Sequence, residues 1–332
     1  MPTTGSKFKK SSKMKNKSLF LVFLLLVLSL FSLYIGSTGY GWFSIESEIL
    51  WQIRLPRLLA AASVGASLGL AGALLQILLQ NPLAEPYTLG ISGGASIGLC
   101  IAMLFPLQPL WISAPIFSGI GCIFSTMIVF YLANLLGRFN QKSLLLSGIL
   151  ISFLASSLTY VFFSILNPYD LQSAISWLIG SFGHERDLWW PMQSLCFFAL
   201  LLFSLKNSKK IDLFLLGEEI SFSFLNQQKY FRLILLLGVG ILTSISVSIC
   251  GMIAFLGLIS PHISMMYLKS MRAKQLLLAS SLIGANLLVF SDLLTKLFYS
   301  WFYLPSGIFV ALLGAPFMIY FLIQESTYAY VD

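Results

Sequence analysis

Few residues in the apolar parts of this chain could carry acid–base or metal chemistry. Asp292 lies in an apolar run and Lys296 follows it by four residues, so the two side chains share one face of a helix and can pair. Because a paired charge costs far less in lipid than an isolated one, we expect an ion pair here. His262 follows Pro261 in another apolar run, without a second His or a carboxylate at helical spacing. We therefore expect His262 to satisfy the local backbone rather than to relay protons or bind a metal.

Motifs for enzymatic catalysis do not occur in the sequence. It contains no GxxxxGK(S/T) phosphate-binding motif, no HExxH and no nucleophile elbow. The cysteines all lie in apolar runs without CxxC spacing, which favours small hydrophobic residues in helix packing over a metal site; they are Cys100, Cys122, Cys196 and Cys250. We therefore predict no catalytic residue, no metal and no cofactor. If ATP drives this protein, a separate chain must hydrolyse it.

The composition places the chain in a membrane. Of 332 residues, 58% are hydrophobic and only 10% are charged, whereas soluble domains carry about 25% charged residues. In lipid, the backbone must satisfy its own hydrogen bonds, which leaves helices or a closed barrel. A barrel would show alternating strands of about ten residues, but the apolar runs here are long and unbroken. The predicted fold class is therefore all-α, a polytopic bundle of membrane helices.

Ten apolar runs approach the length of about 20 helical residues that crosses a hydrocarbon core of about 30 Å. We expect spans near residues 18–36, 57–80, 88–105, 111–136, 143–166, 188–205, 232–250, 252–268, 275–298 and 306–324. Glycines at a spacing of four, which lets helix backbones approach closely, are Gly65 and Gly69, and Gly90, Gly94 and Gly98. The expected organisation is one transmembrane domain, 18–324, after a disordered, basic cytoplasmic tail, 1–17, with a long inner loop at 206–231.

The basic residues predict the orientation of these spans. With the N-terminus in the cytoplasm, sixteen of the twenty Lys and Arg lie in inner segments. Those left outside are Arg54, Arg57, Arg186 and Lys296. The positive-inside rule thus predicts that both termini lie inside. The basic residues behind the net charge of +8 lie at helix ends and set the orientation of the spans, so we expect no nucleic-acid partner. No Ala-x-Ala cleavage site follows the first apolar run, so we expect an uncleaved first helix.

Several short motifs lie in a fixed order along residues 50 to 320, among them Arg54-Leu-Pro-Arg57, Asn81-Pro-Leu-Ala84-Glu-Pro86, Leu215-Leu-Gly-Glu-Glu219, Phe255-Leu-Gly-Leu-Ile-Ser-Pro-His-Ile263 and Leu313-Gly-Ala-Pro-Phe317. As an ordered set they resemble the FecCD family, the permeases of importers for ferric siderophores, haem and cobalamin. The chain departs from the family pattern at Tyr303, Met265 and Asn226. The resemblance implies ten membrane helices, which agrees with the number obtained from hydropathy and charge.

The resemblance assigns roles at the outer end of the bundle. Arg54 and Arg57 are three apart, and with Lys296 they match the basic positions that, in the family, meet acidic residues of a periplasmic binding protein. Two alternatives remain open. Basic side chains at this depth can reach lipid phosphates, and pairing with Asp292 competes for Lys296.

Two further roles at the inner end follow from the resemblance. Asn81 and Leu83 are expected to form part of a cytoplasmic gate, with Gln141 and Lys142 in its other half; the alternative is a simple helix stop at Pro82. The loop 206–231 is expected to couple to an ATPase, the alternative being a solvated acidic patch. The coupling residues would be Leu216, Gly217, Glu218 and Glu219, with neighbours such as Phe214 and Leu215 on the apolar docking face.

The resemblance implies a multi-pass permease subunit of an ABC importer in a bacterial inner membrane. Its expected partners are two copies of an ATP-binding subunit, a periplasmic substrate-binding protein, a second permease chain of the same or a related sequence, and membrane lipid. The expected cargo is an iron chelate (ferric siderophore or haem) or a cobalamin-like corrinoid, with a ferric chelate first. Alternatives are an ion-coupled secondary transporter, whose Na⁺ sites could be built from backbone carbonyls, and a purely structural membrane subunit.

Overall fold

The computed structural model describes residues 4–36, 39–40, 47–105, 109–136, 141–183, 189–216, 228–269, 272–299, 301 and 304–329. The long helices are α1 (Thr4–Tyr34), α3 (Leu55–Leu79), α5 (Leu110–Leu135), α6 (Gln141–Ile165), α12 (Gln228–Cys250), α14 (Ala273–Phe298) and α15 (Ser306–Ala329). The shorter ones are α2 (Ser47–Ile49), α4 (Ile91–Leu104), α7 (Pro168–Leu178), α9 (Trp190–Lys206), α10 (Ser208–Phe214) and α13 (Leu256–Leu268). A π-helical turn, η1 (Leu50–Arg54), a 3₁₀ turn, η2 (Pro86–Leu89), and an antiparallel strand pair, β1 (Ile35–Gly36) and β2 (Gly39–Tyr40), complete the described elements.

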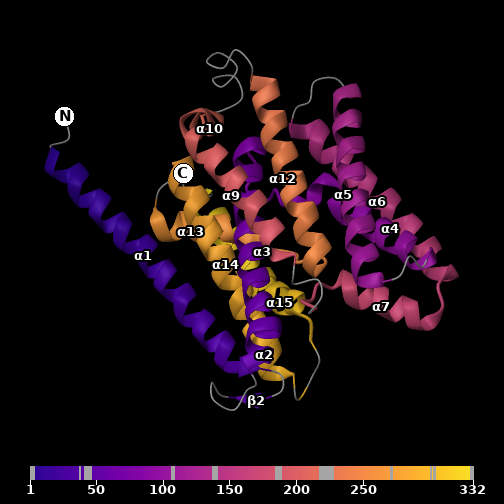
Figure 1. Cartoon of the computed structure of the whole chain (residues 1–332). Coiled ribbons are helices and arrows are strands. Elements are labelled where there is room, and N and C mark those ends of the chain that lie inside the picture. The colour runs from indigo at the N-terminus through magenta and orange to yellow at the C-terminus, as the bar shows by residue number, and fades with distance from the viewer. Residues whose placement is uncertain are drawn as a thin grey trace.

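The connections separate to the two ends of the bundle in the way that the charge pattern predicts (Figure 1). The start of α1 and the short helix α10 lie at the top of the view, and α2, β2 and α7 lie at the bottom. We call these the inner end and the outer end, after the predicted orientation. The long loops that were expected on opposite sides of the membrane therefore emerge at opposite ends of the fold.

The apolar helices match the expected spans. Within the described residues, six helices are long and apolar enough to cross a membrane. Four shorter apolar helices, Ile91–Leu104, Trp190–Lys206, Leu256–Leu268 and Ser306–Phe321, fall on the remaining expected spans. The all-α membrane bundle is thus confirmed. That all ten helices cross the bilayer stays a prediction, because these four apolar stretches, of which the last is the first part of α15, are shorter than the ~20 residues that a perpendicular crossing takes.

Some boundaries differ from the sequence-based expectation. The first helix begins at Thr4, so the tail 1–17, expected to be disordered, is helical from that residue on. Neither Gly nor Pro occurs between Ser6 and Tyr34, and Lys is a good helix former, so nothing local ends the helix. In the same way, the outer loop 37–56 is helical from Ser47, since η1 continues without interruption into α3.

Helix α3 lies at the centre of the bundle, and its glycines set its distance from α14. A Cβ atom on Gly65 would lie 2.5 Å from the carbonyl oxygen of Gly284, and one on Gly69 would collide with the carbonyl of Ser280. The two backbones are therefore in direct contact, which confirms the packing role that their spacing predicts. Most of α3 is buried as a result.

A non-helical break separates α12 from α13, in place of the start expected near residue 252. Gly251 and Phe255 both have positive φ, +74° and +67°. Helix α13 has 13 residues, or about 20 Å at 1.5 Å per residue, which is shorter than the ~30 Å hydrocarbon core. The break therefore lies within the depth of the membrane, where its backbone needs partners from the protein.

Side chains from the segment between α3 and α4 supply those partners. The backbone N–H of Phe255 donates to Glu85 Oε1 at 2.6 Å, and that of Ile253 donates to Tyr87 Oη at 2.9 Å. Gln76 Nε2, near the end of α3, donates to the carbonyl of Leu258 at 3.1 Å. The break is thus held by side chains of one short stretch of this chain, Gln76 to Tyr87, rather than by its own residues.

The substitution Gly69→Ala is expected to lower thermal stability, because the added Cβ would collide with the Ser280 carbonyl. Overpacking of this kind costs about 1–3 kcal/mol. Gly119→Ala is the matched control, since its Cβ would approach only the hydroxyl of Ser248, which can rotate. The measurement is the thermal unfolding midpoint of each variant in detergent. Equal midpoints for the two variants would contradict backbone contact between α3 and α14.

Candidate functional site

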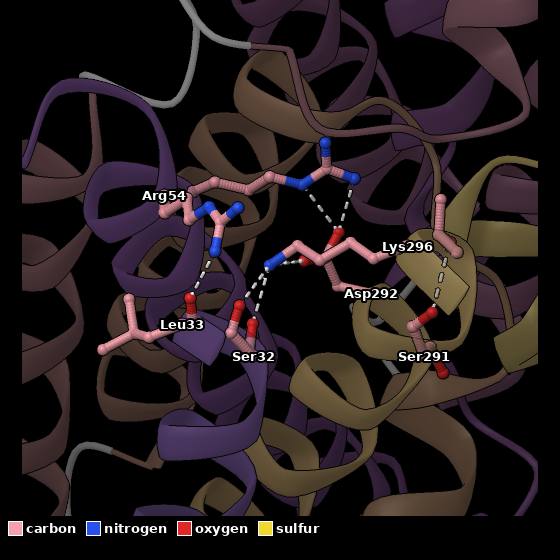
Figure 2. Close-up of polar contacts among 8 residues, drawn as sticks. Ser32, Leu33, Arg54, Ser291, Asp292 and Lys296 are labelled. Carbon is pink, nitrogen blue, oxygen red and sulfur yellow. Dashed lines mark hydrogen bonds and ion pairs between the residues drawn. The ribbon is translucent and has the colours of Figure 1, made fainter. Parts of the chain in front are cut away.

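A cluster of charges joins α3 and α14 at the outer end of the bundle (Figure 2). We call Arg54, Arg57, Asp292 and Lys296 the outer charge cluster. The Asp292 carboxylate is 1% exposed and accepts two hydrogen bonds on Oδ1, from Arg57 Nε at 2.9 Å and Arg57 Nη2 at 2.7 Å. Its Oδ2 lies 3.1 Å from Lys296 Nζ. The predicted pair of Asp292 and Lys296 is confirmed, and Arg57 is a second cation on the same carboxylate.

The cations of the cluster also complete the end of α1. Lys296 Nζ donates to the hydroxyl and the carbonyl oxygen of Ser32, at 2.7 and 3.1 Å. Arg54 Nη1 donates to the carbonyl oxygen of Leu33 at 2.7 Å and to that of Tyr34 at 3.2 Å. Figure 2 shows both side chains directed at this turn. The last carbonyls of a helix have no partner within it and carry partial negative charge, so cations stabilise them.

Burial separates the three residues predicted to dock a binding protein. Arg54 is 4% and Lys296 7% exposed, whereas the side chain of Arg57 is 24% exposed. Arg54 and Lys296 end on the backbone of α1, so neither docking nor contact with lipid phosphates is needed to account for them. Docking stays a prediction, and Arg57 is the member of the cluster whose side chain is accessible to a partner.

The predicted gate residues Asn81 and Leu83 lie in a turn after the inner end of α3. Gln80 ends the helix in a left-handed conformation, with φ +46°. Asn81 Oδ1 then accepts the backbone N–H of Leu83 at 2.9 Å, and the Leu83 side chain is 49% exposed. The turn therefore presents an exposed apolar residue at the inner end, as a gate requires, although its role stays a prediction.

The second pair of predicted gate residues opens α6. Gln141 is the first residue of that helix, and Lys142 is exposed. Seven residues further on, Gly148 packs so closely on Thr88 that a Cβ there would collide with the Thr88 carbonyl. Thr88 belongs to the same connection as Asn81 and Leu83, so the two predicted halves of the gate begin at the same end of the bundle.

The predicted ATPase-coupling residues are only partly described. Leu216, two residues after the end of α10, is 58% exposed, whereas Gly217, Glu218 and Glu219 lie outside the described residues. Phe214, expected on the apolar docking face, is 1% exposed and stacks on Phe231 with ring centroids 6.2 Å apart. Phe214 therefore packs in the core of this chain and fixes α10 to the bundle, and it is not on an exposed docking face.

An exposed row of hydroxyl groups on α6 was not predicted from the sequence. Ser157, Tyr160 and Ser164 recur at a spacing of three and four, so they share one face, and all three are exposed. The exposed surface of α6 also carries apolar side chains such as Phe153 and Val161, and the hydroxyls of Ser157 and Ser164 donate to carbonyl oxygens one turn back in the same helix. Polar side chains in membrane helices usually face a protein partner or a water-filled path. The periodicity of hydroxyl residues in 143–166 was the available signal.

Two cavities within the chain are lined by mainly apolar residues and are small. One, of about 360 Å³, lies between α1, α3, α9 and α14, and the other, of about 200 Å³, lies between α5, α9 and α12. Pockets for drug-sized ligands have volumes of about 300–1,000 Å³. Neither cavity has room for a large chelate, so a path for such a cargo is better placed between two chains.

The remaining candidate residues serve the structure. His262 Nδ1 lies 2.7 Å from the carbonyl oxygen of Leu258, one turn back, which confirms the predicted bond to local backbone. The four cysteines are free thiols, as their apolar settings indicate. Among the residues that the structure describes, no group of three or more His, Cys, Asp or Glu is arranged to hold a metal ion.

Comparison with known proteins matches residues 20–324 to the model of the FecCD transport family. The vitamin B12 import system permease protein BtuC of Vibrio cholerae is 33% identical over 322 residues, covering 95% of this chain and 96% of that protein. The protein of the same name from Klebsiella pneumoniae is 34% identical, covering 92% of each chain. A solved structure of an inward-facing metal-chelate type ABC transporter superposes with a TM-score of 0.80 and 28% identity, covering 94% of this chain and 99% of that one.

The substitution Asp292→Asn is expected to lower the thermal midpoint strongly, because the nearby cations stay in place without their carboxylate. Removing one partner of a buried pair costs about 3–5 kcal/mol. Adding Lys296→Met to this variant is expected to recover part of the loss, since it removes a buried cation. Glu48→Gln, at an exposed residue, is the control and should leave the midpoint unchanged. A wild-type midpoint for Asp292→Asn would show that the cluster does not stabilise the fold.

Proposed function

The chain belongs to the FecCD transport family, and we propose that its cargo is a cobalamin-type corrinoid. As a member of that family it is a multi-pass permease subunit of an ABC importer in the inner membrane, and its work is transport rather than catalysis. The observation that carries the cargo proposal is the near full-length similarity to two vitamin B12 import permeases. A ferric siderophore or haem, favoured from sequence alone, becomes the second candidate.

The exposed hydroxyl row of α6 supports a path between two permease chains. The two cavities described above are too small for a corrinoid, and a cargo of that size needs a path along a protein surface that tolerates polar groups. Ser157, Tyr160 and Ser164 provide such a surface on this chain. A second permease chain, identical or related, would enclose it. Two ATP-binding subunits at the inner end would drive the gates between outward-facing and inward-facing states.

The outer charge cluster supports docking of an acidic periplasmic binding protein. The cluster holds three cations, Arg54, Arg57 and Lys296, against the single carboxylate of Asp292, so the cluster as a whole is positively charged. Charge of this kind attracts an acidic partner even where part of it is buried, and it raises the rate of association. Direct contact would fall to Arg57, the member with the accessible side chain.

An ion-coupled secondary transporter, the alternative left open by the sequence, loses support from this family membership. The structure agrees in one respect. The intramembrane acid Asp292 is engaged by Arg57 and Lys296, so its charge is used to hold helices together and is not positioned to carry protons.

Vesicles that contain this chain with its ATP-binding subunit and binding protein are expected to take up cyanocobalamin only when ATP is supplied. Ferric siderophores and haem, offered in parallel, are expected to be excluded, because binding protein and path would both select the corrinoid. The control is the same complex with the Walker lysine of the ATP-binding subunit replaced. Uptake of a ferric chelate in place of cyanocobalamin would refute the cargo, and uptake on an ion gradient without ATP would refute an importer driven by ATP.

The substitution Arg57→Gln is expected to weaken the binding protein's stimulation of ATP hydrolysis and to reduce its dependence on salt. The loss of one contacting cation should raise the half-maximal binding-protein concentration about tenfold, which corresponds to ~1.4 kcal/mol. Lys274→Gln, at an exposed residue of the inner end that is given no functional role, is the matched control. If the half-maximal concentration did not change in a variant that keeps the wild-type thermal midpoint, Arg57 would not be a docking residue.

A further inference from the structure

Helix α10 connects the predicted ATPase-coupling loop to the membrane bundle. It ends at Phe214, directly before the exposed Leu215 and Leu216. Ile211 and Phe214 are 0% and 1% exposed, so the helix is fixed to the bundle on one face. If a partner displaced the loop, α10 would move with it and would displace the helix ends that it contacts, because tightly packed apolar side chains transmit such a movement.

The first of these contacts leads to the gate. Gln80 Nε2 donates to the carbonyl oxygen of Phe214, the last residue of α10, at 2.8 Å. Gln80 is also the left-handed residue that ends α3 and immediately precedes Asn81. Left-handed geometry is unfavourable for a residue with a Cβ. The amide thus joins the ends of α10 and α3 at the residue where the gate turn begins.

The second contact leads to the start of α14. Asp212 Oδ1 accepts the backbone N–H of Ala273, the first residue of that helix. The N-cap residue Arg272 makes no side-chain cap of its own, so Asp212 acts as the cap from a different helix. Through these two bonds α10 holds the inner ends of α3 and α14, the helices whose backbones are in contact through Gly65 and Gly69.

The gate turn is linked in the other direction to the α12–α13 break. Glu85 and Tyr87 accept the backbone N–H groups of Phe255 and Ile253. The segment from Gln80 to Tyr87 is therefore tied at its start to α10 and at its end to the non-helical break between α12 and α13. A shift of α10 would therefore move the start of this segment relative to its end, which the break holds in place, and so change the conformation of the gate turn between them.

We propose that Gln80 and Asp212 are positioning residues that transmit movement of the ATPase-facing loop through α10 to the gate at Asn81 and Leu83. This proposal rests on the importer function, and it adds residues outside the sequence motif that marks the coupling loop. Two hydrogen bonds would transmit the movement, one from Gln80 to the Phe214 carbonyl and one from the Ala273 N–H to Asp212. Each can be removed by a substitution that keeps the local backbone geometry, so coupling and folding can be measured separately.

The variants follow from that geometry. Gln80→Gly removes the amide but suits the left-handed conformation, so it is expected to keep or raise the thermal midpoint. Asp212→Ala removes the cap, whereas Asp212→Asn keeps a side-chain oxygen that can accept the Ala273 N–H and serves as the matched control. All are studied in the complete complex in vesicles, with cargo moved per ATP hydrolysed as the first readout.

The expected result is an uncoupled transporter. Gln80→Gly and Asp212→Ala should lower the cargo moved per ATP about fivefold or more, the lower end of usual coupling energies. Basal ATP hydrolysis should stay within about twofold of wild type, and Asp212→Asn should behave as wild type. A ratio of cargo to ATP that is unchanged in both variants would overturn the proposal. So would a fall in transport and ATP hydrolysis in parallel with the thermal midpoint, which indicates a purely structural bond.

A second readout does not depend on the identity of the cargo. Leu83→Cys, at an exposed residue of the gate turn, should change its rate of labelling by a membrane-impermeant thiol reagent when ATP is added to inside-out vesicles. In the Gln80→Gly and Asp212→Ala backgrounds that ATP-dependent change should be lost. The change persisting in both backgrounds would refute the transmission, even if cyanocobalamin proved to be the wrong cargo. The chain without Leu83→Cys gives the background from native thiols, of which Cys196 is partly exposed.

Discussion

A backbone amide or carbonyl inside a bilayer has no water to bind, and the irregular parts of this fold are arranged around that constraint. At the break between α12 and α13, Glu85 and Tyr87 accept the N–H groups of Phe255 and Ile253. At the end of α1, cationic side chains from η1 and α14 donate to the last carbonyls. In both places a distant segment completes a helix end, and so the helices are fixed relative to one another through their own termini.

The outer charge cluster shows how the same constraint bears on function. A cation that docks a partner must reach the surface, while a cation that caps a helix in lipid must be buried. Lys296 and Arg54 meet the second requirement, and Arg57 lies between the two. The carboxylate of Asp292 lowers the free-energy cost of burying these cations, because without it their charges would be isolated. Stability and recognition are therefore divided among neighbouring residues of one cluster.

The inner end uses helix termini in a different way. There, Gln80 and Asp212 join three helix ends by single hydrogen bonds, beside the exposed Leu215 and Leu216. The central helices α3 and α14 are held rigidly by backbone contact along their length. A rigid pair with a linked inner end and a charged outer end is suited to move as a body, which is what an importer with alternating access requires. The cargo would cross beside this body, along α6, rather than through it.

Short-range features of the sequence determined much of this protein. Hydropathy and charge predicted the helical bundle and its two ends, glycine spacing predicted the close packing of α3, and a spacing of four predicted the pair of Asp292 and Lys296. The family resemblance, too, was visible in local motifs. All of these depend on neighbours along one helix or on bulk composition, which is why they can be inferred without coordinates.

Tertiary structure alone decided which distant residues complete each other. Arg57 is 235 residues from Asp292, and Gln80 is 134 from Phe214, and no periodicity relates such positions. The later start of α13 was also missed, since a helix boundary in lipid depends on whether another segment can satisfy the exposed backbone. A sequence lists the polar groups that need partners, but the partner of each is fixed only when the helices pack.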